Sequence, residues 1–141
     1  MKSTAAKPAV LFVCVKNGGK SQMAAGLMKL ETHDGVTVTS AGTTPGKAVN
    51  QLSAEVLLDL GVDISTEQPT LLTEDAMRKA GLVVVLGTEA TVPAVDGVAV
   101  EVWETDEPSH RGIEGRERME LVRDDIHARV KELKQRLLGE R

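Results

Sequence analysis

Aromatic side chains are almost absent from this chain of 141 residues, which has one phenylalanine, one tryptophan and no tyrosine. Sites that bind nucleobases or aryl groups usually stack them on aromatic rings, so little recognition of that kind is available here. Cysteine is equally scarce, because Cys14 is the only one. A single cysteine excludes an internal disulfide and a four-thiolate metal site.

Long apolar runs and an excess of positive charge are also missing. No stretch has the length needed to span a bilayer, and residues 1–7 lack the apolar core and cleavage site of a signal peptide. We therefore expect a cytoplasmic protein that does not bind membranes. The net charge is −4, from 17 basic and 21 acidic side chains, which gives no general reason to bind nucleic acid. An anionic ligand would therefore have to be bound by hydrogen-bond donors and positive charges within its own site.

Strand-like and helix-like segments alternate along the chain. Apolar or β-branched runs typical of strands cover residues 8–14, 36–40, 82–86 and 98–103. Helical spacing or helix-end signals cover residues 21–32, 50–60, 73–81 and 113–138. This alternation predicts one α/β domain over residues 1–141, with a four-stranded parallel sheet flanked by helices. Ligands of such sheets lie at the carboxyl ends of the strands, where we expect Cys14 and Asp106.

The stretch from Cys14 to Ser21 joins the first predicted strand to the first predicted helix. Gly18 and Gly19 allow backbone N–H groups to converge on an anion, and Ser21 stands at a natural N-cap position. Together with Lys20 and the helix N-terminus, these donors would bind a small oxyanion and favour the nucleophilic thiolate of Cys14. The alternative is an inert thiol beside a flexible turn and a solvated lysine.

An acidic loop follows the last predicted strand and contains Asp106 and Glu107, directly before Pro108. At this edge of the sheet a departing oxygen would need a proton, so both carboxyl groups are candidates for the general acid. Which of the two faces inward stays open, and the loop could also be solvated charge at a proline turn. The histidines His33, His110 and His127 show no metal-ligand spacing, so we expect no metal site.

The chain resembles the low-molecular-weight protein tyrosine phosphatase family and, within it, the arsenate reductases. The phosphate-binding loop (P-loop) of that family is cysteine, two residues, asparagine, two residues, arginine and serine. Cys14, Asn17 and Ser21 match this loop, whereas Lys20 replaces the arginine. Further segments resemble the family in the same order, at residues 22–24, 40–43, 61–65 and 103–109. The resemblance covers nearly the whole chain and implies the family's fold.

The resemblance also implies a role for each residue of the loop. Cys14 would be the catalytic nucleophile, Ser21 would hydrogen-bond its sulfur, and Lys20 would act in place of the arginine. The oxyanion would be bound by the loop backbone, at Val15, Lys16, Asn17, Gly18, Gly19 and Lys20. The general acid of the family directly precedes a proline, which puts Glu107 at that place and Asp106 one residue earlier.

Reduction of arsenate needs two electrons, and the resemblance implies that they come from outside this chain. Thioredoxin-coupled arsenate reductases carry a resolving pair of cysteines, but Gly87 stands at the place of the first and there is no second. The chain is thus similar to the actinobacterial arsenate-mycothiol transferases. This implies mycothiol, or else glutathione, as co-substrate, a mycoredoxin or glutaredoxin-like partner, and no bound cofactor.

Two other functions stay open beside arsenate detoxification. A phosphotyrosine phosphatase would share the loop, but Lys20 lacks the bidentate fork of arginine, and Ser109 stands where such enzymes often have a tyrosine. A non-catalytic oxyanion-binding domain would keep the fold without the chemistry. We predict the first function, an enzyme that transfers arsenate to a small thiol.

Overall fold

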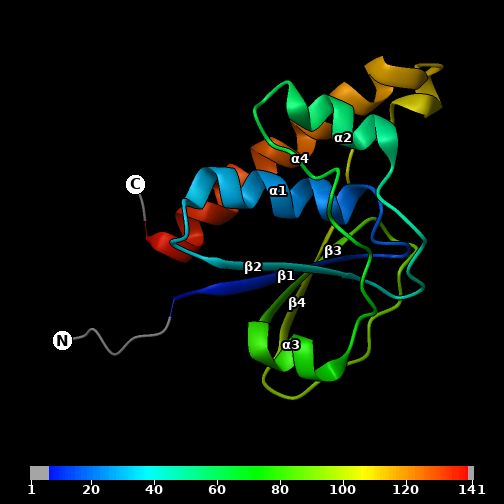
Figure 1. Ribbon diagram of the computed structural model, residues 1–141. Helices are drawn as coiled ribbons and strands as arrows, with labels where there is room; N and C mark the ends of the chain where they lie inside the picture. The colour runs from blue at the N-terminus through cyan, green and yellow to red at the C-terminus, as the bar shows by residue number, and fades with distance from the viewer. Residues whose placement is uncertain (1–6, 140–141) are drawn as a thin grey trace.

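Four parallel strands form the centre of the computed structural model, which describes residues 7–139 (Figure 1). The strands are β1 (Ala9–Cys14), β2 (Thr37–Gly42), β3 (Leu82–Leu86) and β4 (Ala99–Trp103), and they lie in the order β2-β1-β3-β4. The two inner strands, β1 and β3, are apolar throughout because both of their faces are buried. The register pairs Cys14 with Gly42 and Leu86 with Trp103, so all four strands end at one edge.

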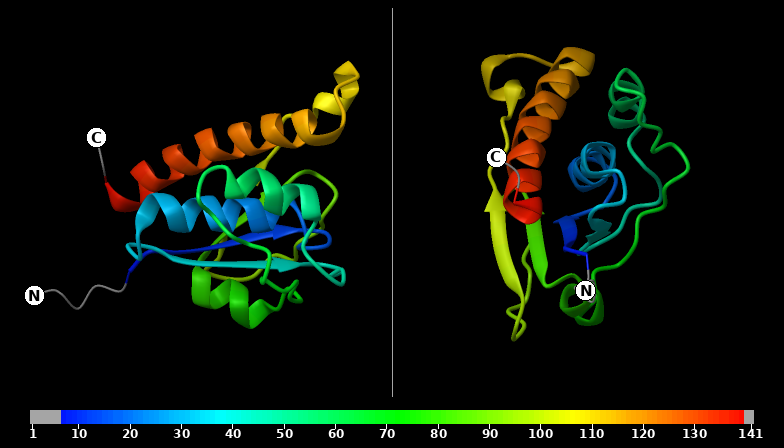
Figure 2. Two further views of the ribbon diagram at one scale, coloured as in Figure 1. Left: turned by 45° about the horizontal axis from the view of Figure 1, so that its top comes forward. Right: turned by 90° about the vertical axis from the view of Figure 1, so that its left-hand side faces the viewer.

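The helices cover the two faces of the sheet unequally. Figures 1 and 2 show α1 (Lys20–Thr32), α2 (Gln51–Leu58) and α4 (Gly115–Leu138) on one face, and α3 (Glu74–Ala80) on the other. Alternate residues of β1 point to opposite faces, so Val10 and Phe12 join the core under α1 and α4, while Leu11 and Val13 join the core beside α3. The predicted fold class is confirmed.

The two aromatic side chains of the chain pack against each other in the larger core. The ring centroids of Phe12 and Trp103 are 5.7 Å apart, with the rings tilted by 57°. The indole N–H of Trp103 donates to Glu101 Oε2 at 2.8 Å, which satisfies its polar group. Trp103 is only 5% exposed, so neither aromatic ring serves as a stacking surface for a ligand.

Local signals explain most element boundaries. The side chain of Asn50 accepts the N–H of Ser53 and starts α2, whereas Gly81 adopts a φ of 75° and ends α3. Three boundaries lie two residues away from the prediction. Strand β2 continues to Gly42 because it pairs with the full length of β1, α2 ends at Leu58 rather than at residue 60, and α4 begins at Gly115 rather than at residue 113, after a short 3-10 helix, η2 (Pro108–Arg111).

Residues 1–6 and 140–141 lie outside the described residues. The prediction that residues 1–7 are not a signal peptide falls mostly on these residues, and so do both ends of the predicted domain. Within residues 7–139, none of the helices combines the length and the apolar character needed to cross a bilayer.

Candidate active site

Residues 14–21, which we call the anion loop, are held from outside through their carbonyl groups. Backbone N–H groups of one neighbouring segment, residues 43–50, donate to four of these carbonyls. The pairs are Thr43 to Cys14 (3.1 Å), Thr44 to Val15 (2.8 Å), Gly46 to Lys16 (3.0 Å) and Asn50 to Gly18 (2.6 Å). Of the other loop carbonyls, those of Asn17 and Gly19 accept from Gln22 Nε2 (3.2 Å) and from the N–H of Met23 (2.9 Å).

This arrangement turns the N–H groups of the loop inward. No described peptide bond is cis, and in a trans peptide the C=O of one residue and the N–H of the next point in opposite directions. Because the carbonyls from Cys14 to Gly19 all bind outside groups, the N–H groups of residues 15–20 face the inner side of the loop. Among the described residues, only the N–H of Asn17 finds an acceptor there, so five donors are available to an oxyanion.

Asn17 fixes the shape of the loop. It is fully buried and adopts a left-handed φ of 53°, a conformation that asparagine tolerates better than most residues. Its Oδ1 accepts the backbone N–H of Thr70 at 2.9 Å, and since that N–H can only donate, the orientation of the amide is determined. Its Nδ2 therefore donates to Ser21 Oγ, at 2.8 Å.

The sulfur of Cys14 lies between two of these groups. The backbone N–H of Asn17 donates to Sγ at 3.2 Å, and Ser21 Oγ lies 2.8 Å from it. Because Ser21 Oγ already accepts from Asn17 Nδ2, its hydroxyl proton can be given to the sulfur. Both contacts stabilise negative charge on Sγ, and Cys14 is partly exposed, so a substrate can reach it.

Two glycines are required because backbone segments approach the loop closely. A Cβ at Gly18 would lie 2.9 Å from the carbonyl oxygen of Ala48, and a Cβ at Gly42 would lie 2.7 Å from that of Val15. Neither neighbour is a flexible side chain that could move aside. The predicted role of Gly18 in shaping the loop thus has a steric basis beyond flexibility.

Lys20 extends from the anion loop to the acidic loop, residues 104–109. Its Nζ lies 3.9 Å from Glu107 Oε1, and both side chains are about a quarter exposed. Glu107 is bound more closely by Arg118, with Nε to Oε2 at 2.8 Å and Nη2 to Oε1 at 3.0 Å, and by Ser109 Oγ at 2.6 Å. The Arg118 guanidinium is the main reason that the pKa of Glu107 falls from 4.5 to about 2.

Asp106 faces a different partner. Its carboxylate accepts two hydrogen bonds from Arg111, at 2.8 and 3.0 Å, and this guanidinium lowers the pKa of Asp106. Within the described part of the chain, neither Asp106 nor Glu107 contacts Cys14, and the lowered pKa of each carboxyl group disfavours the protonated form that a general acid needs. Of the two predicted acids, the structure brings only Glu107 to the anion loop, through Lys20.

Several residues that build this site carry no sequence signal for it. Arg118 lies within the predicted helix over residues 113–138, and residues 43–49 lie between a predicted strand and a predicted helix. No local pattern marks either, because their contacts join segments distant in the chain. Among residues 7–139, no group of three or more His, Cys, Asp or Glu is placed to hold a metal ion.

Comparison with known proteins places this chain in a family. The model of the family described as low molecular weight phosphotyrosine protein phosphatase matches residues 9–141, so the chain belongs to that family. Within it, the chain is similar to arsenate reductases. The arsenate reductase of Staphylococcus aureus (strain Newman) is 32% identical over 133 residues, which cover 92% of this chain and 98% of that protein. The predicted resemblance is confirmed.

Solved structures agree with this placement. The thioredoxin-dependent arsenate reductase of Corynebacterium glutamicum aligns with a TM-score of 0.81 and 30% identity over 98% of this chain. This chain spans 65% of the length of that protein. A low molecular weight protein tyrosine phosphatase from T. tengcongensis has a TM-score of 0.74 at 21% identity, covers 93% of this chain and 100% of its own, and shows the shared fold.

Proposed function

We propose that this protein is an arsenate reductase of the arsenate-mycothiol transferase type, which binds arsenate in the anion loop and transfers it to a small thiol. One observation carries the proposal: the only cysteine of the chain lies at a ring of inward backbone N–H groups, with two donors on its sulfur. The similarity to arsenate reductases supports arsenate as the oxyanion. A reducing compartment, the cytoplasm, suits a mechanism that needs free thiols.

In the first step, Cys14 attacks arsenic. A sulfur–arsenic bond forms and one arsenic–oxygen bond breaks, so the thiol and H₂AsO₄⁻ give the Cys14–S–AsO₃H⁻ adduct and water, and arsenic remains As(V). The N–H groups of residues 15–20 bind the oxyanion oxygens, and Lys20 adds a positive charge as a point donor. For the proton that the departing oxygen takes up, Asp106 and Glu107 stay the candidates.

In the second step, an external thiol displaces Cys14. Its sulfur bonds to arsenic, the Cys14–arsenic bond breaks, and the proton of the thiol passes to the Cys14 sulfur, which regenerates the enzyme. A redoxin thiolate then attacks the sulfur of the released adduct, and the sulfur–arsenic electron pair stays on arsenic, which becomes As(III). The expected redoxin is mycoredoxin or a glutaredoxin-like protein. Both electrons come from thiols outside this chain.

The lone cysteine favours this route over the one named for the C. glutamicum neighbour. That protein is described as thioredoxin-dependent. A relay that forms a disulfide within the chain needs at least two cysteines, and this sequence has one. The position predicted to match a resolving cysteine is Gly87, which has a φ of 90° at the end of β3.

The test is arsenate-dependent NADPH oxidation with mycothiol, mycoredoxin and its NADPH-dependent reductase. We expect turnover only when arsenate, thiol and redoxin are all present, and a loss of about a thousandfold or more for Cys14→Ser. His33→Asn is the matched control, because it keeps a residue suited to the left-handed φ of 45° and lies far along the chain from the anion loop. Turnover by Cys14→Ser equal to wild type would refute the proposal.

A phosphotyrosine phosphatase is the second candidate, because the matching family model carries that description. Rapid release of an aryl phosphate without arsenate-dependent NADPH oxidation would favour it. If neither assay shows activity but the protein still binds phosphate or sulfate, it is a non-catalytic oxyanion-binding domain.

A further inference from the structure

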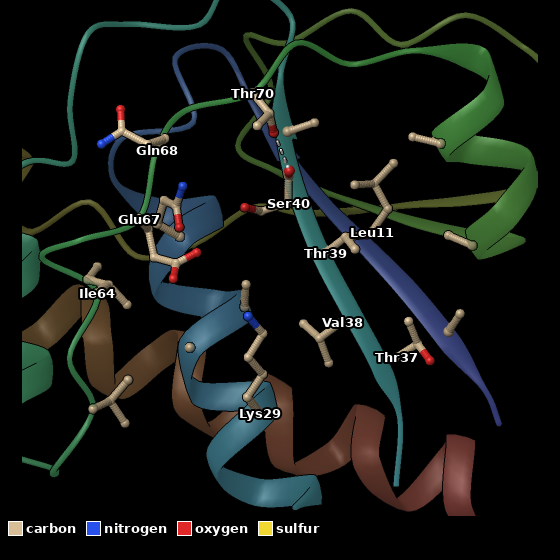
Figure 3. A pocket seen from close by; sticks show the side chains of 18 of the residues that line it. Leu11, Lys29, Thr37, Val38, Thr39, Ser40, Ile64, Glu67, Gln68 and Thr70 are labelled. Carbon is tan, nitrogen blue, oxygen red and sulfur yellow. Dashed lines mark hydrogen bonds between the residues drawn. The ribbon is translucent and has the colours of Figure 1, made fainter. Parts of the chain in front are cut away.

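Beside the anion loop lies a cleft of about 420 Å³, and its lining residues outside that loop have no role in the two chemical steps. Three segments distant in the sequence form it, residues 16–20, 46–53 and 118–122, and we call it the cationic cleft. Its volume lies in the range of pockets that bind small molecules. A separate cavity of about 810 Å³ runs along β2, at the place where Thr70 Oγ1 donates to the carbonyl of Ser40 (Figure 3). None of residues 14–21, the anion loop, lines this second cavity.

Unopposed positive charge distinguishes the cationic cleft. None of the acidic residues between positions 7 and 139 lines it, although the chain as a whole has a net charge of −4. Lys20 and Arg118 at its border are paired with Glu107. Lys16 and Lys47 are exposed, and within residues 7–139 neither has an ion-pair or hydrogen-bond partner for its ammonium group. These two lysines can therefore bind oxygen acceptors of a ligand.

The rest of the lining combines a further donor with an apolar wall. Asn50 Oδ1 accepts the N–H of Ser53 at 2.9 Å, so the Nδ2 of the same amide points away from the helix it caps and has no acceptor among the described residues. Met119 and Val122 of α4 contribute apolar atoms to the lining. This lining suits a molecule with several oxygen acceptors and a small apolar part.

Gly19 connects the cationic cleft with the anion loop. A Cβ at this position would approach only Ser53 Oγ, at 3.8 Å, so a side chain here would extend into open space and occupy the cleft. Gly18 differs, because its Cβ would collide with the Ala48 carbonyl oxygen. We conclude that Gly18 is needed to close the loop, whereas the absence of a side chain at Gly19 keeps space in the cleft next to the loop.

We propose that the cationic cleft binds the second substrate, an oxygen-rich small thiol of peptide or pseudo-disaccharide size. The assignment rests on the proposed function. Carboxylate or hydroxyl oxygens of the thiol contact Lys16, Lys47 and Asn50, which directs its sulfur past Gly19 to the arsenic on Cys14. There the new sulfur–arsenic bond forms, the bond to Cys14 breaks, and the thiol proton passes to the Cys14 sulfur.

The kinetic test reverses one charge of the cleft. With the redoxin in excess, Lys47→Glu should raise the KM for the thiol about tenfold or more and change the KM for arsenate by less than about twofold. Lys29→Glu is the matched control, because Lys29 is also exposed but lies on α1 beside the other cavity. Equal effects of both variants, or an effect of Lys47→Glu on arsenate alone, would overturn the assignment.

A binding test separates this assignment from the proposed function. We would titrate S-methyl mycothiol and S-methyl glutathione into phosphate-saturated wild type and follow the backbone amide resonances. We expect shifts centred on residues 46–50 that Lys47→Glu weakens about tenfold and Lys29→Glu leaves unchanged. If these shifts occur but the protein turns over no arsenate, the thiol site in the cleft is supported and the proposed function is rejected. If turnover depends on the thiol but the shifts lie elsewhere, the thiol site in the cleft is rejected. The analogue that binds identifies the thiol.

Discussion

The anion loop and the acidic loop lie at the same edge of the sheet but are held by different forces. Neutral groups hold the anion loop, through backbone carbonyls and the buried amide of Asn17. Charged groups hold the acidic loop, where Glu107 is paired with Arg118 and Asp106 with Arg111, all of them at least a quarter exposed. Buried hydrogen bonds resist salt and pH, whereas partly exposed ion pairs do not.

Because of this difference, the two loops have different roles at the site. In the proposed function the oxyanion is bound by donors whose positions do not depend on ionisation, so the binding geometry should be kept over a wide range of conditions. The ammonium group of Lys20, which belongs to the anion loop, is paired instead with Glu107 of the acidic loop, so its position depends on the charge state of Glu107. Conditions that change ionisation should therefore alter turnover before they alter the fold.

The largest effect should follow from breaking the anion loop with Asn17→Ala. The substitution removes the acceptor of the Thr70 N–H and the donor to Ser21, and it puts alanine in a left-handed conformation. We expect the free energy of unfolding to fall by about 2–4 kcal/mol, and kcat/KM for arsenate to fall about a hundredfold. Denaturant unfolding followed by the fluorescence of Trp103, the only tryptophan, measures the first effect.

Asn17→Gly serves as the control, since glycine accepts the left-handed φ but lacks the amide. It should recover only the part of the loss that is due to backbone strain. If Asn17→Ala unfolded with nearly the wild-type free energy, the anion loop would not be held by this side chain, and the contrast between the two loops would be lost.

A smaller effect is expected from the acidic loop. Glu107→Gln should lower the free energy of unfolding at pH 7 by about 1–2 kcal/mol, less than the full pKa shift implies, because solvent screens the partly exposed pair. Since the pKa of Glu107 is about 2 in the folded protein and 4.5 otherwise, its carboxylate stabilises the fold above pH 4.5. This contribution is lost as the pH falls from 4.5 through 2.

The measurement is the difference in unfolding free energy between wild type and Glu107→Gln across that range of pH. Glu89→Gln, at an exposed position with no partner within residues 7–139, should show no such trend. A difference that stayed constant down to pH 2 would show that the ion pair with Arg118 is not the source of stability.

The two loops also differ in how far the sequence predicted them. The ends of β1 and α1, the glycine pair and the lone cysteine are local features, and they predicted where the anion loop lies between strand and helix. The prediction of Ser21 as the N-cap was wrong, because Gly19 is the N-cap of α1 and Ser21 lies inside the helix, where its hydroxyl contacts the Cys14 sulfur. Four carbonyl partners of the loop could not be predicted, because they come from residues 43–50, which meet the loop only when β2 pairs with β1. Pairing of this kind is a property of the folded chain.

In the acidic loop, contacts between distant segments limit prediction from the sequence even more. The sequence placed Asp106 and Glu107 at the correct edge of the sheet but could not separate them, since neighbouring side chains in a loop have no fixed periodicity. The separation comes from Arg118, eleven residues beyond Glu107 and on another element. The assignment of a proton donor stays a prediction for both carboxyl groups.

The salt dependence of stability should also distinguish the two loops, although this effect is smaller still. At 1 M salt, where the screening length is about 3 Å, the stability difference between wild type and Glu107→Gln should shrink by about half. The difference between wild type and Asn17→Ala should stay within about 0.5 kcal/mol of its value at low salt, since it comes from buried neutral groups. Parallel denaturant titrations at low and high sodium chloride measure both. Equal salt dependence of the two variants would contradict the division of forces.

The smallest effect is expected for Asp106→Asn. Asp106 contacts Arg111 and not Lys20, so its loss should change kcat by less than about threefold, against about tenfold for Glu107→Gln, which frees Lys20. Initial rates of arsenate-dependent NADPH oxidation at saturating thiol measure both values. If Asp106→Asn instead lowered kcat about a hundredfold, Asp106 would be the proton donor, and the acidic loop would have to leave Arg111 and reach the anion loop during each turnover.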